Sequence, residues 1–366
     1  MDETSGSEWQ WFRHAIRDSL LRPRRFAATL AGEHYGLAGV LVALLAGVCF
    51  SVTVDAALVS GKGLDPTDHV SRIVTDAFFL GLRVAIVMAV LSVAVFLVSQ
   101  LLRRTGISLD QSFTAVAFAL TPVLAAPVLA LVLVVVPQTL PAVAVLAALL
   151  VLRLLYGLIE NLRRLLPIAA ALAGAFVVVL SVPFVLADQV SRIEFVALGY
   201  LPQLAPELVA PPFAGETFVF TGEGYELTLP ASWKSVPLGL PDQIGRFETA
   251  TNVLVVMRVR GNVFVTLDGF ADIAGIPWRR GLTETGSWLF NRGSSSRTIE
   301  RTRDLVLVDD TFRGSVEGRV ELLRQFTAAG ATQGIALQFR YIEPPDERRA
   351  LDESTAIGAS WRALGR

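Results

Sequence analysis

Five long stretches with almost no charged side chain occupy the first half of this sequence. About 20 consecutive apolar residues are enough for a helix to cross the hydrocarbon core of a bilayer. Hydrophobic residues make up 53% of the chain and charged residues only 18%, which is more apolar surface than a globular core ordinarily buries. We therefore expect a bundle of five transmembrane helices, over residues 36–54, 84–102, 112–136, 141–159 and 165–187.

Charge, cysteine and histidine content exclude several classes of function. The 32 basic and 33 acidic side chains nearly cancel, so no strong field attracts nucleic acid. Cys49 has no partner in the chain, which excludes an internal disulfide and a cysteine-based metal site. The three histidines, His14, His34 and His69, precede the second half, which therefore has no histidine base. We expect no cofactor, no metal and no catalytic residue.

Arginines mark one side of the predicted bundle. They cluster before the first stretch, after the second and after the fourth, at positions 13, 17, 22, 24, 25, 103, 104, 163 and 164. The positive-inside rule then predicts a cytoplasmic N-terminus, and five spans place the chain after residue 187 outside the cytoplasm. The first apolar stretch begins too late for a cleavable signal, so we expect the first span to be a signal anchor in the cell membrane.

The segment 1–35 is predicted to hold a short amphipathic helix. Its apolar residues recur at helical spacing, whereas its charged residues are expected to face away; they are Trp9, Phe12, Ile16 and Leu20 against Arg13, Arg17 and Asp18. Two placements fit this pattern equally well, one in the membrane interface and one packed on the bundle. The nearby arginines favour anionic lipid by ~1 kcal/mol per charge.

Charges inside apolar stretches are candidates for function. Asp55 and Arg83 are predicted at similar depth on consecutive spans and could pair, with Asp76 competing for the arginine. The alternative is an Arg83 side chain that reaches the outer headgroups. Arg153 and Glu160 lie near the cytoplasmic end of the fourth span, where an interface position is favoured.

Small residues and prolines predict how the helices pack. Gly39, Ala43, Gly47 and Ser51 recur every four residues on the first span, which predicts a face for close packing in the bundle or in a homodimer. Pro122, Pro127 and Pro183 lie inside predicted spans and are expected to kink them.

The second half is richer in charge and glycine and is predicted to be water-soluble. Residues 188–212 read as a proline-rich linker, and 213–366 as an α+β domain with a mostly antiparallel sheet. Strands are predicted over 217–220, 225–229, 253–259, 263–267, 305–308, 317–326 and 335–341. A helix is predicted to end within 283–290, and another over 352–364 to close the domain.

Candidate chemistry in the second half is sparse. Lys234 lies near Ser232 and Ser235, a Ser/Lys arrangement that a solvated turn explains better. Two acidic pairs, Asp309 with Asp310 and Asp268 with Asp272, fit a cation site or paired carboxylates, but also a turn and a helix-face repeat. No phosphate-binding loop and no zinc motif is found.

The first half resembles the Yip-domain family of five-span membrane proteins. The motifs are LLRPRRF at 20–26, LRRTG at 102–106, QSF at 111–113 and FALTP at 118–122. The resemblance implies a five-span fold with an amphipathic start and a proline-containing third span. The small-GTPase role of eukaryotic members is not implied, because their acidic-leucine-glycine-proline signature has no counterpart around residues 18–23.

The second half is similar to the PsbP-like group of small α/β domains. The motifs are YELTLP at 225–230 with Trp233, and IGASW at 357–361. This resemblance implies an antiparallel sheet closed by a helix, and a role in binding or assembly.

These observations favour a non-catalytic membrane protein whose bundle anchors an extracytoplasmic domain. The resemblance to bacterial Yip-domain members, and the presence of only two lysines, Lys62 and Lys234, among many arginines, favour a bacterial cell membrane. The partners expected are the lipid bilayer and, for the outer domain, an envelope protein or a lipid. A small-solute or ion transporter ranks second, because the predicted spans offer few polar side chains for a path across the membrane. A membrane-anchored enzyme ranks third, for want of a nucleophile with a base.

Overall fold

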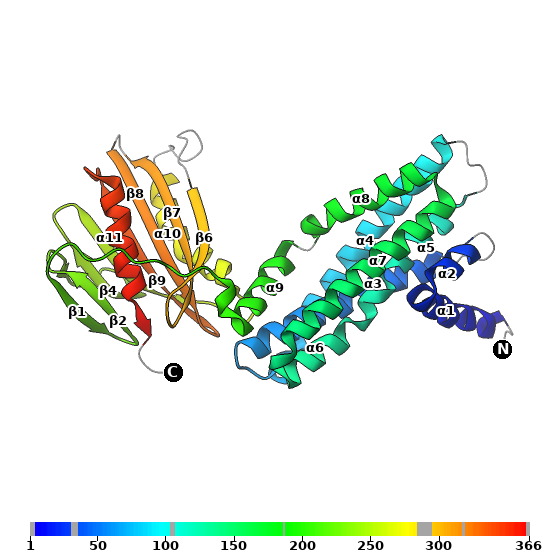
Figure 1. The fold of residues 1–366 in the computed structure, drawn as a ribbon, viewed down its shortest axis with the longest axis horizontal. Helices are drawn as coiled ribbons and strands as arrows, with labels where there is room; N and C mark the ends of the chain where they lie inside the picture. The colour runs from blue at the N-terminus through cyan, green and yellow to red at the C-terminus, as the bar shows by residue number, and fades with distance from the viewer. Residues whose placement is uncertain are drawn as a thin grey trace. The chain divides into compact units, whose positions relative to one another are not determined.

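The computed structural model describes residues 4–30, 36–102, 107–185, 187–283, 295–316 and 319–363. The chain divides into two compact units, Met1–Ile193 and Glu194–Arg366. The first unit is helical and the second combines an antiparallel sheet with helices (Figure 1). This agrees with the predicted fold class of a helical bundle followed by an α+β domain.

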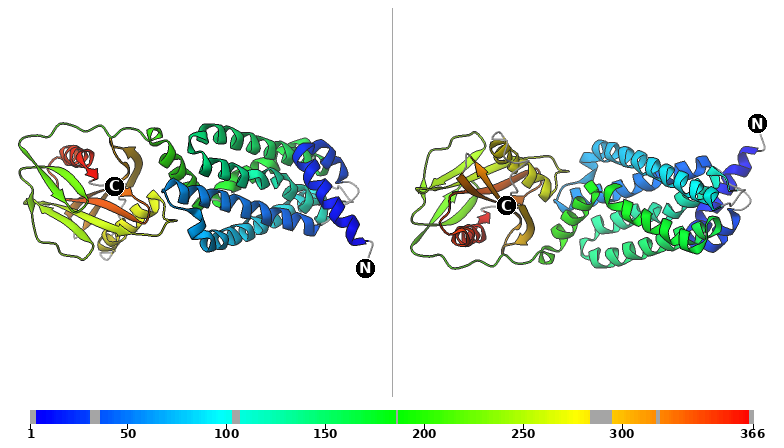
Figure 2. Two further views of the ribbon diagram at one scale, coloured as in Figure 1. Left: turned by 90° about the horizontal axis from the view of Figure 1, so that it is seen from below. Right: turned by 90° about the horizontal axis from the view of Figure 1, so that it is seen from above.

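The first unit, here called the membrane unit, consists of helices. Their bounds are α1 Thr4–Leu21, α2 Pro23–Thr29, α3 Gly36–Gly61, η1 Pro66–His69, α4 Val70–Leu101, α5 Leu109–Ala117, η2 Phe118–Ala125, α6 Ala126–Val135, η3 Pro137–Thr139, α7 Leu140–Leu165, α8 Ile168–Val185 and α9 Ala187–Tyr200, which continues into the second unit. Helices α3, α4, α6, α7 and α8 run side by side (Figures 1 and 2). Helices α1 and α2 lie at one end of this bundle, and the loops from α3 to α4 and from α6 to α7 lie at the other.

Four helical segments of the described chain are long and apolar enough to cross a membrane. They are Leu37–Gly61, Pro66–Leu101, Leu109–Val135 and Pro141–Leu165. The fifth predicted span corresponds to α8, whose apolar part Ile168–Val178 is shorter. Length and composition therefore support four spans, and the count of five stays a prediction.

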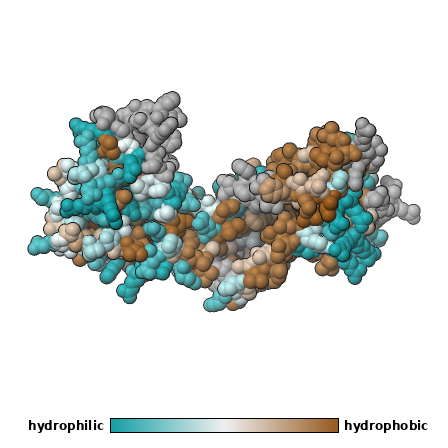
Figure 3. All heavy atoms as spheres, turned by 45° about the horizontal axis from the view of Figure 1, so that its top comes forward, coloured by the Kyte–Doolittle hydropathy of each residue, from teal (hydrophilic) through white to brown (hydrophobic). Residues whose placement is uncertain are grey.

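The outside of the membrane unit is apolar along the helices. Large side chains that would be buried in a soluble protein are exposed on α4, α6, α7 and α8, and Phe79, Val90, Leu131, Leu152 and Phe176 are 61% to 64% exposed. Figure 3 shows this surface in brown, with teal at the end that holds α1 and α2. A contiguous exposed apolar surface of this kind is stable when lipid covers it.

Pro122 breaks the third span as its position predicts. The span consists of α5, the 3₁₀ stretch η2 with Pro122 inside, and α6. Proline has no N–H, so the carbonyl of Phe118 loses its helical donor. The Ser19 hydroxyl of α1 donates to this carbonyl at 2.7 Å, and the Thr121 hydroxyl lies 3.0 Å from it. The break therefore becomes an attachment point for α1.

Helices α1 and α2 pack on the bundle, which is one of the two placements predicted for the N-terminal segment. Phe12 and Phe26 are buried against Phe118, and the rings of Phe26 and Phe118 stack at 5.0 Å. Asp18 was expected to face away from the bundle but is only 7% exposed. It turns inward because Arg25 of α2 approaches its carboxylate to 3.5 Å.

The small-residue face of α3 contacts neighbours inside the bundle. A Cβ added at Gly47 would lie 2.7 Å from the Cα of Gly81 on α4, and one at Gly39 would meet the Phe113 ring at 2.6 Å. Ala43 and Ser51 have no exposed surface. The backbones of α3 and α4 therefore touch at the Gly47–Gly81 crossing.

We expect Gly47→Ala to destabilise the membrane unit by about 1–3 kcal/mol, because the added methyl group meets backbone that cannot move alone. The matched control is Gly174→Ala on α8, whose new Cβ would meet, among the described residues, Leu162 Cδ1 at an ordinary contact distance of 3.4 Å. Thermal unfolding of the purified chain in detergent measures both. Equal midpoints for the two variants would contradict the close crossing.

The second unit, here called the α+β unit, has two antiparallel sheets. The larger has the order β3-β4-β5-β9-β8-β7-β6 and the smaller β1-β2-β10. The bounds are β1 Thr217–Gly222, β2 Tyr225–Pro230, β3 Lys234–Ser235, β4 Gln243–Glu248, β5 Asn252–Arg260, α10 Leu267–Thr283, β6 Ser295–Arg301, β7 Val306–Val316, β8 Arg319–Ala329, β9 Gln333–Ile342, α11 Glu347–Ser360 and β10 Arg362–Ala363; η4 Pro202–Leu204 precedes them.

The two helices of the α+β unit cover opposite faces of the large sheet. Along β8, Gln325 contacts α10, whereas its neighbours Arg324 and Phe326 contact α11. Successive side chains of a strand point to opposite faces, so this alternation places the helices on the two sides. Figure 1 shows α11 in front of the sheet and α10 behind it. The main core lies on the α11 side, where Tyr225, Phe247, Phe339 and Trp361 are buried.

Several boundaries differ from the prediction. The strand predicted over 263–267 is wrong, because the Asn262 side chain bonds the Phe264 N–H and the Thr266 hydroxyl accepts from the Gly269 N–H at the start of α10. Strands β4 and β6 were not predicted. The helix end predicted within 283–290 lies outside the described residues after Thr283.

The predicted linker over 188–212 is not an extended spacer. It is helical as far as Tyr200. Its proline-rich part then follows the edge strand β6, where Arg301 N–H donates to the Pro206 carbonyl and Leu208 N–H donates to the Arg301 carbonyl. The prolines allow this pairing because edge positions do not require every N–H.

Candidate functional site

A buried charge cluster lies at the end of the bundle away from α1. Asp55 of α3 has no exposed surface, and its carboxylate forms an ion pair with Arg192 of α9. The Ser51 hydroxyl donates to the same carboxylate at 3.0 Å. Arg192 also approaches Asp76 of α4 at 3.4 Å. One arginine therefore holds two helices through two carboxylates.

The expected pair of Asp55 with Arg83 is thus replaced by a pair with Arg192. Asp76, expected to compete for Arg83, instead lies beside Arg192, and Arg72, one turn earlier on α4, contacts it at 3.2 Å. Arg83 is exposed on the outer face of α4. Next to the cluster, burial and the charge of Arg192 lower the pKa of Lys62 to about 8. Arg192 was missed because its segment was interpreted as a linker; its position just beyond the last apolar stretch was the available signal.

We expect Arg192→Leu to destabilise the membrane unit by about 3–5 kcal/mol, because it leaves the Asp55 carboxylate buried without its cation. Asp55→Ala should lower the free energy of unfolding by less, since Arg192 still has the Asp76 carboxylate beside it. The double variant should recover much of the loss. Detergent thermal melts measure this, with Arg164→Leu, an exposed arginine at the other end of the unit, as the control that we expect to change little. Additive losses in the double variant would contradict the pair.

Arg153 and Glu160 act at the other end of the membrane unit. The Arg153 guanidinium donates to the carbonyls of Ser19 and Leu20, at 2.6 Å for Leu20, and so caps the C-terminus of α1. Glu160 is 9% exposed and contacts Arg163 at 3.3 Å and Arg24 at 3.7 Å. Both side chains therefore attach the N-terminal helices to α7.

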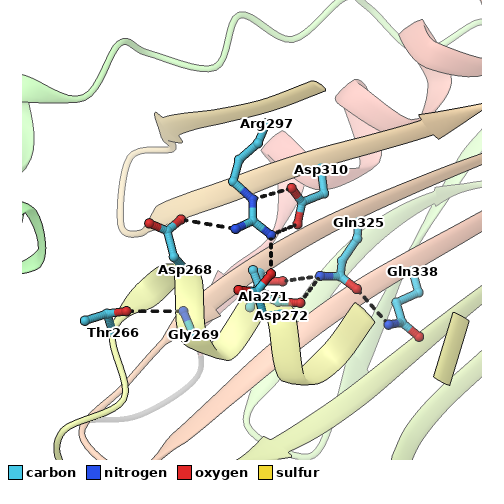
Figure 4. A network of polar contacts seen from close by, with 10 residues as sticks. Thr266, Asp268, Gly269, Ala271, Asp272, Arg297, Asp310, Gln325 and Gln338 are labelled. Atoms are coloured by element: carbon cyan, nitrogen blue, oxygen red, sulfur yellow. Dashed lines mark hydrogen bonds and ion pairs between the residues drawn. The ribbon is translucent and has the colours of Figure 1, made fainter. Parts of the chain in front are cut away.

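A second polar cluster surrounds Arg297 in the α+β unit. Arg297 on β6 makes two hydrogen bonds to Asp310, the residue opposite it on β7, at 2.6 Å and 2.9 Å. Its guanidinium also donates to Asp272 at 2.9 Å and lies 3.7 Å from Asp268. Figure 4 shows the carboxylates of α10 and β7 converging on this arginine. The helix-face repeat of Asp268 and Asp272 is real, and its partner is an arginine of the same chain.

This cluster has more carboxylates than guanidinium groups, because Asp268, Asp272 and Asp310 surround Arg297. Burial raises the pKa of Asp268; Arg297 opposes the rise, while Asp272 and Asp310 add to it. Burial and the charge of Asp268 raise the pKa of Glu194. The hydrogen bonds to Asp310 raise the pKa of Arg297. An incoming cation would relieve this repulsion, whereas an anion would increase it.

A cavity of about 440 Å³ opens beside the cluster. Its lining combines charged and apolar residues, which are Glu194, Asp268 and Arg297 together with Leu198, Leu204, Ala205, Pro206 and Ile299. Within the described residues no group of three His, Cys, Asp or Glu side chains is arranged to hold a metal ion. The cavity combines a polar anchor with apolar surface, as small-molecule and peptide sites do.

The remaining candidates of the second half are placed as follows. Asp309 forms a bidentate pair with Arg324 at 2.6 Å and 3.0 Å, on the sheet face opposite Asp310. Lys234 is exposed on the edge strand β3, beside Ser235. Under α10, Gln338 donates to the Gln325 side chain at 2.8 Å and to the Ala274 carbonyl. Sequence patterns gave no sign of this glutamine pair.

We expect the two aspartates around Arg297 to respond differently to neutralisation. Asp310→Asn should destabilise the α+β unit by about 1–3 kcal/mol, because it removes a buried bidentate partner. Asp268 has a raised pKa in the folded state, so its contribution to stability is largest at acid pH and is lost as pH rises through that pKa. Asp268→Asn should therefore change little at acid pH and stabilise the unit at neutral pH.

Urea denaturation of residues 194–366 over a range of pH tests this expectation. The wild type should lose stability relative to Asp268→Asn as pH rises through the folded pKa of Asp268. Equal destabilisation by both variants at neutral pH would contradict the different roles.

Comparison with known proteins gives structural neighbours only. No protein-family model matches the chain, and no curated protein sequence matches it. Similar solved structures are cyanobacterial PsbP (CyanoP) from Synechocystis sp. PCC 6803, with 16% identity over 43% of this chain and 99% of that one, at a TM-score of 0.31, and LpqN from Mycobacterium tuberculosis, described as involved in cell envelope biogenesis, with 12% identity over 43% and 89%, at 0.30.

A third neighbour is a crystal structure from Bacteroides thetaiotaomicron VPI-5482, with 13% identity over 42% of this chain at a TM-score of 0.28. The chain spans about half the length of that protein. The PsbP-like neighbours cover the C-terminal part of the chain. The resemblance of the first half to the Yip-domain family stays a prediction.

Proposed function

We propose that this chain is a non-catalytic integral membrane protein of a bacterial cell membrane. In this proposal five spans, the four long helices and α8, anchor the chain with its N-terminus in the cytoplasm. The α+β unit then lies outside the cytoplasm and binds a partner of the envelope. The bundle supplies attachment and the outer unit supplies recognition.

The observation that carries the proposal is the contrast between the two surfaces. The membrane unit exposes Phe79, Val90 and Leu131 on its outer helix faces, where only lipid can cover them at low cost. The α+β unit buries large aromatic side chains in a core of its own, and its surface carries charged side chains. Such a pair of units fits a membrane anchor that carries a water-exposed domain.

The cavity beside Arg297 is the proposed contact point for the partner. Its carboxylates outnumber its one guanidinium, so a partner group that fits is cationic with an apolar stem, such as a lysine or arginine side chain. The cavity lies at the β6 edge of the large sheet, opposite the β3 edge. A crosslinking residue placed at each edge in turn therefore distinguishes binding at the cavity from crosslinking at any exposed position.

Reporter fusions and crosslinking test the proposal. A phosphatase fused after residue 366 should be active and one fused after residue 104 inactive, and the reverse pattern would overturn the orientation. A photo-crosslinking residue in place of Leu204, 61% exposed at the cavity, should capture an envelope component in cells. The matched control in place of Leu238, 53% exposed near β3, should not capture it. Equal capture at both positions would contradict a site at the cavity.

A transporter is the second candidate, and the Asp55 cluster is the observation that favours it. Ionisable side chains inside transmembrane helices commonly mark ion or proton pathways. A pathway would lose transport in Asp55→Ala and would not regain it in the double variant with Arg192→Leu. If the pair is structural, the double variant should instead regain thermal stability. Measuring transport and thermal stability together therefore distinguishes a transporter from an anchor.

A further inference from the structure

Seven exposed arginines gather where α1, α2 and the end of α7 meet. We call them the arginine surface; they are Arg13, Arg17, Arg22, Arg24, Arg25, Arg163 and Arg164. Among the described residues, the carboxylates that form ion pairs with them are Asp18 and Glu160. The surface therefore carries a large surplus of positive charge.

The two carboxylates hold four of these arginines in place. Asp18 contacts both Arg17 and Arg25 at 3.5 Å. Glu160 contacts Arg163 at 3.3 Å and Arg24 at 3.7 Å. Both carboxylates are nearly buried, at 7% and 9% exposure, so they act as fixed anchors beneath the guanidinium groups. Guanidinium groups fixed in this way are suited to bidentate contacts with phosphate oxygens.

Apolar side chains beside the arginines indicate where the phosphate comes from. Trp9 and Leu21 of α1 are 59% and 69% exposed, next to Arg13 and Arg17. Tryptophan is enriched at the boundary between headgroups and acyl chains. A free anion in water would leave these apolar side chains uncovered, whereas a lipid covers them with its acyl chain and meets the arginines with its headgroup.

We propose that the arginine surface is a binding site for the phosphate headgroups of anionic lipids, in the leaflet where α1 and α2 lie. The charge complementarity is direct, because basic clusters next to membrane helices bind anionic headgroups. The inference rests on the membrane anchoring in the proposed function. It does not depend on the orientation of the chain or on a partner of the α+β unit.

The test uses the full chain in nanodiscs of phosphatidylcholine that contain a trace of spin-labelled phosphatidylglycerol. The fraction of immobilised label gives the association constant relative to spin-labelled phosphatidylcholine. The triple variant Arg22→Gln, Arg24→Gln, Arg25→Gln should lower the preference for phosphatidylglycerol by up to about a hundredfold, since the roughly fivefold contributions of three charges multiply. The preference should also fall as salt is added.

The triple variant is designed to fold. Asp18 keeps Arg17 and Glu160 keeps Arg163, so neither buried carboxylate loses every cation. The variant loses the exposed contacts of Arg24 with Glu160 and of Arg25 with Asp18, which contribute little each, so its thermal melt should stay cooperative with a midpoint close to that of the wild type. The matched control removes three exposed arginines of the α+β unit, Arg303→Gln, Arg348→Gln and Arg349→Gln, and should leave the lipid preference unchanged.

Three results would overturn the proposal. They are an unchanged preference in the triple variant, an equal loss in the control variant, and complete competition by inorganic phosphate at the concentration of the labelled lipid. Failure of the wild-type chain to enter nanodiscs would instead contradict the membrane anchoring itself. The lipid site and the proposed function therefore fail in distinguishable ways.

Discussion

A polar group inside an apolar helix bundle costs free energy unless it finds a hydrogen-bond partner within the protein. This constraint explains contacts that are otherwise unrelated. The Phe118 carbonyl, freed by Pro122, accepts from Ser19. The last carbonyls of α1 accept from Arg153. Asp55 pairs with Arg192. Each solution ties a segment outside the bundle to a helix within it.

In the α+β unit, buried carboxylates find their partners in arginines of neighbouring strands. Arg297 pairs with Asp310 directly opposite it, and Arg324 pairs with Asp309 on the other face of the sheet. The Arg324 guanidinium also lies 4.6 Å over the Phe326 ring and donates to the Leu351 carbonyl of α11. A planar guanidinium can satisfy a carboxylate, a carbonyl and a ring together, which a lysine cannot. The near absence of lysine from this chain is consistent with that use of arginine.

Sequence patterns predicted those helices and strands whose formation depends mainly on the burial of nearby residues. The apolar stretches marked the helices, and alternation marked β2, β5, β8 and β9, because burial on one or both faces shapes the sequence directly. The stretch 263–267 misled, since its β-branched residues favour a strand while Asn262 and Thr266 form the turn and the helix start that replace it. Two short-range hydrogen bonds outweighed the intrinsic preference of the side chains.

The sites could be predicted only in part, because their partners are distant in sequence. Asp55 and Asp76 were recognised as unusual from their surroundings, but Arg192 lies more than a hundred residues away in a segment whose helix was not expected. Asp268, Asp272 and Asp310 were recognised as acidic pairs, but their shared partner Arg297 is on a strand that the sequence did not reveal.

Exposure then separates two uses of arginine that composition alone cannot distinguish. Arg192 has a side chain only 15% exposed with two carboxylates beside it, so its charge is neutralised within the fold. The arginines around Asp18 and Glu160 are exposed and exceed their carboxylates in number. A buried arginine whose charge is matched holds helices together, whereas an exposed surplus must be balanced by charge from outside the chain. The same residue type therefore fixes the bundle at one end and forms an exposed, positively charged surface at the other.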